Sequence, residues 1–93
     1  MEVAAVGSPE FTLGFELVGI KTYNYTNPEE IKRLAKEQTG VVIIDDKTMN
    51  SFDEFQRKEF EDSLMPLFIV LSEKETQESI SKLIKKSIGI ALN

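Results

Sequence analysis

The fold of this chain is set by the stretch Gly40-Val41-Val42-Ile43-Ile44-Asp45-Asp46. Its β-branched residues follow one another with no polar residue between them. A strand with one solvated face alternates apolar and polar side chains, so an unbroken apolar run predicts a central parallel strand covered on both faces. Leu67-Phe68-Ile69-Val70-Leu71 has the same character and predicts a second fully buried strand.

A helix is expected directly before the central strand. Asn27 is a typical N-cap, and Pro28 suits the first helical position, where its missing N–H costs nothing. Gly40 ends the helix. Its expected buried stripe consists of Ile31, Leu34 and Ala35.

Another helix is expected after the central strand. Ser51 is followed three residues later by Glu54, which is the spacing of a capping box. Pro66 ends this helix, because the residue before a proline disfavours helical geometry. The residues expected to point inward are Phe52, Phe55, Phe60 and Leu64.

The amino-terminal part of the chain predicts a strand, a helix and a strand. The first strand covers residues 2–6, and Ser8-Pro9 begins the helix. Gly19 ends it. Its buried face consists of Phe11, Phe15 and Val18. The second strand is predicted over residues 21–26 as an edge strand, because polar residues separate two tyrosines on one side, Tyr23 and Tyr25.

A final helix is predicted from residue 73 or 76 to residue 87, with an apolar stripe of Ile80, Leu83, Ile84 and Ile88. The complete βαβαβαβα pattern predicts an α/β fold of Rossmann-like or receiver-like type. We expect a four-stranded parallel sheet in the order 2-1-3-4 with helices on both faces. We expect residues 1–72 to form the globular domain, and residues 73–93 to form a helix and tail that belong to it or make a detached arm.

The composition limits the chemistry of this chain. Its 93 residues include no cysteine and no histidine, which excludes Cys/His zinc sites and every Ser-His or Cys-His nucleophile pair. We therefore expect no catalytic residue, no metal site and no cofactor. A net charge of −5 disfavours nucleic acid and anionic membrane. Neither a signal peptide nor an apolar run near the roughly 20 residues of a membrane span is expected.

Asp45 and Asp46 follow the central strand directly, where open α/β sheets place their ligands. Receiver domains keep their phospho-acceptor aspartate there, so one hypothesis is a receiver-like signalling domain phosphorylated on Asp45. A receiver also needs an acidic pair after its first strand and a lysine after a fifth strand. Here Ser8-Pro9-Glu10 follows the first strand, and no fifth strand is predicted. The alternative is that the two acids favour the next helix N-terminus.

The stripe of the final helix also allows two interpretations. Ile80, Leu83, Ile84 and Ile88 could close the sheet, or they could bind another protein. Ile90 and Leu92 continue the apolar character toward a chain end that normally frays, which favours a partner.

Several segments in collinear order resemble the F subunit of the archaeal-type (A-type) and vacuolar-type (V-type) rotary ATP synthases. Gly14-Phe15-Glu16-Leu17-Val18-Gly19 is similar to the family's GFRLAG stretch, and Gly40-Val41-Val42-Ile43-Ile44 to its GIILI strand. Ser63-Leu64-Met65-Pro66 and the segment over residues 84–90 match as well. The sequence departs from the family pattern at three places: Ser8 replaces a common Asp, Glu16 a frequent basic residue, and Asp46-Lys47 a more acidic pair.

The resemblance implies a non-catalytic subunit of the central stalk, part of the rotor, bound to the coiled coil of the D subunit. Such a protein helps to couple ATP synthesis or hydrolysis to proton or sodium transport. It lies at the cytoplasmic face of the cell membrane as a peripheral part of the complex, and touches the membrane only through that complex. The family's C-terminal helix is its mobile element and contacts the catalytic head, which places the partner-binding residues at Ile80, Leu83, Ile84 and Ile88.

Overall fold

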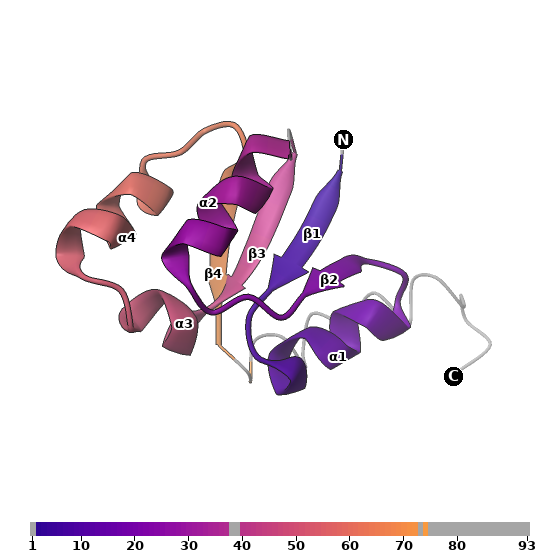
Figure 1. Cartoon of the computed structure of the whole chain (residues 1–93). Coiled ribbons are helices and arrows are strands. Elements are labelled where there is room, and N and C mark those ends of the chain that lie inside the picture. Colours follow the sequence, from indigo (N-terminus) through magenta and orange to yellow (C-terminus); the bar gives the residue numbers. More distant parts are fainter. Residues whose placement is uncertain (1, 38–39, 73, 75–93) are drawn as a thin grey trace.

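The computed structural model describes residues 2–37, 40–72 and 74. Four parallel strands form one sheet in the order β2-β1-β3-β4 (Figure 1). The strands are β1 (Val3–Val6), β2 (Lys21–Tyr23), β3 (Val41–Asp45) and β4 (Leu67–Leu71). The predicted fold class and strand order are confirmed.

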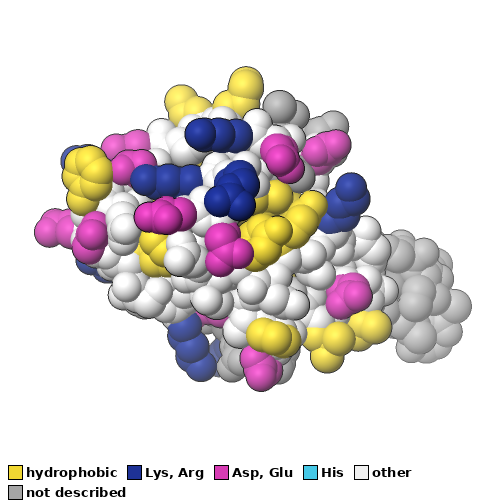
Figure 2. Space-filling view, in the orientation of Figure 1, with side chains coloured by type: hydrophobic (Ala, Val, Ile, Leu, Met, Phe, Trp, Pro, Cys, Tyr) yellow, Lys and Arg dark blue, Asp and Glu magenta, His cyan; other side chains and the backbone are white. Residues whose placement is uncertain are grey.

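Helices cover both faces of the sheet, as predicted. The helices are α1 (Pro9–Leu17), α2 (Pro28–Glu37), α3 (Asp46–Asn50) and α4 (Glu54–Glu61). Helix α1 packs on one face, and α2, α3 and α4 lie on the other (Figure 1). On the face seen in Figure 2, acidic and basic side chains are mixed, with hydrophobic side chains showing between them.

The two faces of the sheet have cores of different size. On the α1 face the buried cluster is small: Ala5, Phe11 and Phe15. The opposite face holds a larger buried cluster: Val6, Ile31, Leu34, Val42, Ile44, Met49, Phe52 and Phe60. Most of the apolar burial that stabilises the described part of the chain therefore lies beneath α2, α3 and α4.

Helix α1 begins and ends where the sequence predicts. Phe11 N donates a hydrogen bond of 3.4 Å to Ser8 Oγ, so Ser8 is the N-cap. Gly19 follows the helix with φ +87°, a conformation that glycine adopts without steric cost. The rings of Phe11 and Phe15 lie 5.4 Å apart and pack against Ala5, whose small side chain lets them approach the sheet.

Strand β2 is shorter than the predicted range of residues 21–26, since it ends at Tyr23. Asn24 leaves the sheet, and its side-chain amide donates to Thr12 Oγ1 at 2.8 Å and to the Gly7 carbonyl at 3.4 Å. These bonds tie the end of β2 to the start of α1. Tyr23 and Tyr25 still lie on the same side, with ring centroids 5.5 Å apart.

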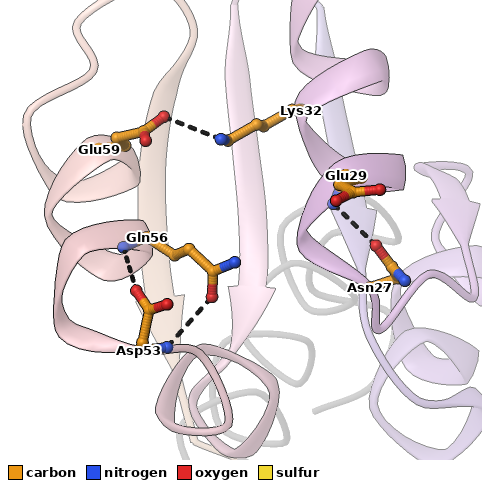
Figure 3. A network of polar contacts seen from close by, with 6 residues as sticks. All are labelled: Asn27, Glu29, Lys32, Asp53, Gln56 and Glu59. Atoms are coloured by element: carbon orange, nitrogen blue, oxygen red, sulfur yellow. Dashed lines mark hydrogen bonds and ion pairs between the residues drawn. The ribbon is translucent and has the colours of Figure 1, made fainter.

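The single helix predicted after the central strand is wrong, because the chain forms two helices there. Asp53 rather than Ser51 is the N-cap of α4. Gln56 N donates to Asp53 Oδ1 at 2.7 Å, and Asp53 N donates to Gln56 Oε1 at 3.1 Å (Figure 3). Ser51 Oγ instead donates to the Thr48 carbonyl at the end of α3.

Two residues predicted to point inward from this region are exposed. Phe55 is 75% exposed and Leu64 is 85% exposed, whereas Phe52 and Phe60 are buried. Phe55 and Phe60 are five residues apart, which in an α-helix turns one side chain about 140° away from the other. Leu64 lies beyond the end of α4.

The prediction that β4 is fully buried is also wrong. Leu67, Ile69 and Val70 are each about two-fifths exposed. Strand β4 lies at the edge of the sheet, and Phe68 is its residue packed against the larger core. The apolar run of β4 therefore does not mean that the described helices bury this strand. The predicted final helix lies outside the described residues.

Candidate functional site

The predicted partner-binding stripe, Ile80, Leu83, Ile84 and Ile88, lies outside the described residues. The described part of the molecule can still show which surfaces are open to binding. Three regions are relevant: the sheet face beside β4, the end of β3 at Asp45, and a groove between β2 and α2.

An apolar surface lies on the α1 face of β3 and β4. The parallel register places Val41 beside Leu67 and Ile43 beside Ile69. Ile43 and Leu71 pack against the small α1-side cluster, and side chains two residues apart in a strand share a face. We call Val41, Ile43, Leu67 and Ile69 the open sheet face. Its outer residues, Leu67 and Ile69, are 42% and 39% exposed.

Asp45 occupies the position expected from the sequence, at the carboxyl end of β3. It is only 5% exposed and caps α3. Its Oδ1 accepts a hydrogen bond of 2.8 Å from Lys47 N. Its Oδ2 accepts weaker bonds from Thr48 Oγ1 at 3.4 Å and from Ser8 Oγ at 3.5 Å. These contacts use both carboxylate oxygens in local structure.

Gly7 closes the space above Asp45. Gly7 has φ +147°, and a Cβ placed on it would lie 2.8 Å from Asp45 Cβ. The end of β1 therefore approaches the aspartate too closely for any side chain at position 7. No group of three His, Cys, Asp or Glu side chains that could hold a metal ion occurs among the described residues. The described geometry makes Asp45 a structural cap.

A groove that the sequence did not predict lies between the edge of the sheet and α2. Its volume is about 100 Å³, and its lining consists of Tyr23, Tyr25, Glu30, Arg33, Leu34 and Glu37. The helical residues recur at positions i, i+3, i+4 and i+7, so they form one stripe of α2. The spacing of these helical residues is visible in the sequence. The tyrosines opposite them lie at and just after the end of β2, which the spacing does not reveal.

No described helix is a membrane span. None of them combines the length and the apolar composition needed to cross a bilayer.

The sequence is similar to known proteins along almost its whole length. Residues 3–90 match the family model described as ATP synthase (F/14-kDa) subunit. The F subunit of the A-type ATP synthase of Methanospirillum hungatei JF-1 is 35% identical over 98 aligned positions, which cover 99% of this chain and 98% of that protein.

Two further relatives carry the same name. The A-type ATP synthase F subunit of Archaeoglobus fulgidus is 34% identical, with 98% of this chain and 96% of the relative aligned. That of Methanocorpusculum labreanum is 32% identical, with 99% and 98% aligned. The match therefore spans almost the whole chain, residues 73–90 included, and the chain belongs to the family of ATP synthase F subunits.

Proposed function

We propose that this chain is a non-catalytic component of the central stalk of an A-type or V-type rotary ATP synthase. The end-to-end match to the F subunit is the observation that carries the proposal. The composition supports it, because a chain without histidine and cysteine lacks the commonest general base and the commonest nucleophile pairs. The role of Asp45 as a helix cap also supports it, since that carboxylate is engaged locally.

The proposed partner is the coiled-coil D subunit, held through the stripe of Ile80, Leu83, Ile84 and Ile88. In this arrangement the chain turns with the rotor and helps to couple ATP synthesis or hydrolysis to proton or sodium transport. The C-terminal helix also contacts the catalytic head. The protein is peripheral and lies at the cytoplasmic face of the cell membrane, as part of the complex.

The open sheet face offers the same stripe a second contact. It presents apolar side chains of β3 and of β4, the last strand before residues 73–93. Residues 73–93 can then belong to the globular domain in the isolated protein or form an arm that reaches a partner. The stripe is buried whether it packs on the open sheet face or on a partner. Of these two contacts, the one that buries more apolar surface is favoured.

Co-expression with the D subunit of the same genome tests the proposal. The wild-type chain should co-purify as a stable complex, and Ile84→Asp should weaken it by about tenfold or more, because a charge enters an apolar contact. Lys82→Gln is the matched control: it also lowers the charge by one, but Lys82 lies on the opposite side of the predicted helix. If the wild-type chain does not co-purify with this coiled coil, the proposed function is wrong.

A further inference from the structure

The groove between β2 and α2 combines aromatic and charged groups at the edge of the molecule. Tyr23 and Tyr25 are partly buried, and their rings contact each other with a tilt of 31° between their planes. Leu34 forms the buried floor. Figure 2 shows hydrophobic surface beside basic and acidic side chains over this region of α2.

The charged residues of the groove alternate in sign along α2. Glu30, Arg33 and Glu37 form a negative, positive, negative row on the helix stripe that faces the tyrosines. The two glutamates are seven positions apart in the sequence, which is about 10.5 Å along a helix axis. The row is therefore long enough to match two turns of another helix.

None of these groups has a partner within the described part of the chain. No hydrogen bond or ion pair there engages the Arg33 guanidinium, the Glu30 and Glu37 carboxylates or the tyrosine hydroxyls. Lys32 on the neighbouring stripe, in contrast, pairs with Glu59 at 3.1 Å (Figure 3). The groove thus presents its charges and hydroxyls to an outside molecule.

The size of the groove favours a protein partner over a small molecule. Pockets for cofactors and drug-sized ligands usually measure about 300–1,000 Å³, so a volume of about 100 Å³ is too small for them. It can accept one or two side chains of another protein. Tyrosine and arginine are also the residue types that dominate the binding energy of protein interfaces.

We propose that this groove binds a helix of the coiled-coil partner whose surface carries a basic, acidic, basic row at one-turn spacing. The basic side chains of that helix pair with Glu30 and Glu37, and its acidic side chain pairs with Arg33. Tyr23 and Tyr25 pack against the stems of its long side chains. The proposal rests on the proposed function, because it takes the partner to be the D subunit, and it assigns the globular domain a contact separate from the C-terminal stripe.

Charge reversal on α2 tests this contact in the full chain. Arg33→Glu should weaken binding to the coiled-coil partner about tenfold or more, because three negative charges would then face it. Lys36→Glu is the matched control, since Lys36 is an exposed cation of the same helix that does not line the groove. It should change binding less than about threefold. Binding is measured by titration calorimetry at low salt and at high salt, which should weaken only the charge-dependent part.

The outcomes separate this proposal from the proposed function. If the wild-type chain binds the coiled coil but Arg33→Glu behaves like Lys36→Glu, the groove assignment is wrong and the function stands. If the isolated wild-type chain dimerises, as judged by light scattering, and Arg33→Glu makes it monomeric, a second copy occupies the groove and the proposal fails. If the wild-type chain does not bind the coiled coil, the proposed function itself fails. Thermal melts should show that both variants remain folded, because both substituted residues are exposed.

Discussion

At the scale of single residues, Asp45 has the position of a receiver aspartate but serves as the N-cap of α3, with Gly7 packed closely above it. The strand end brings an aspartate to the place where open α/β sheets bind ligands. The approach of Gly7 and the hydrogen bonds from Lys47 N and Thr48 Oγ1 then commit that carboxylate to holding α3 in place. Position in the fold alone does not give a residue its chemistry.

Treatment with an acyl-phosphate donor and magnesium tests this interpretation of Asp45. Intact-mass spectrometry should show no added phosphoryl group, because the carboxylate is buried and the described residues provide no metal-binding cluster. A genuine receiver domain treated in parallel is the positive control. Phosphorylation of the wild-type chain that is lost in Asp45→Asn would restore the signalling hypothesis.

At the scale of helices and strands, local capping decides where elements begin. Asp53 and Gln56 complete a reciprocal capping box, whereas Ser51 bonds backward to Thr48. The chain therefore turns between α3 and α4. In α4, Phe60 is buried and Phe55 is exposed. Phe55 and Phe60 are five residues apart in α4, so the helix that buries Phe60 turns Phe55 toward solvent.

Alanine substitution of these two phenylalanines measures that difference. Phe60→Ala should lower the free energy of unfolding by about 3 kcal/mol or more, because it removes a ring packed against Phe52 and Phe68. Phe55→Ala should change it by about 0.5 kcal/mol or less, because that ring is three-quarters exposed. Urea denaturation provides both values. Equal losses in the two variants would contradict the assigned α4 boundaries.

The strength of the local signals decides how much of the fold the sequence could predict. Ser8-Pro9 and Asn27-Pro28 mark helix starts by side-chain chemistry alone, and the structure has helices beginning at Pro9 and Pro28. The apolar run of β4 indicated a strand correctly, but its exposure depends on which helices cover an edge strand, which no local pattern records.

The groove shows a similar limit at the level of a site. The spacing of Glu30, Arg33 and Glu37 predicts a shared stripe of α2, but not what that stripe faces. Tyr23 ends β2 and Tyr25 lies two residues beyond it, and the packing of β2 against β1 brings them beside α2. A site assembled from two elements is therefore hidden until their arrangement is known.

At the scale of the whole molecule, the described part of the chain is stabilised unequally on its two sides. Eight buried residues support the face under α2, α3 and α4, whereas three support the α1 face. The open sheet face lies on the weaker side. A segment or a partner that covers the open sheet face would therefore add buried apolar surface on the side of the sheet with the smaller core.

Amide hydrogen exchange tests whether residues 73–93 act as the mobile arm. Exchange from about Ser79 onward should be fast in the isolated protein and slower in the complex with the coiled-coil partner, because partner contact protects the backbone. Amides of β1 and β3 at the centre of the sheet serve as an internal reference, since they should stay protected in both states. Equal protection of the C-terminal segment in both states would argue against a mobile arm.

The aromatic composition of the groove has a practical consequence for spectroscopy. The chain contains no tryptophan and two tyrosines, and both tyrosines line the groove beside α2. Its intrinsic tyrosine fluorescence therefore originates from this single location. Binding of a partner helix that contains neither tryptophan nor tyrosine would change this emission, so contact at this surface can be followed without a label.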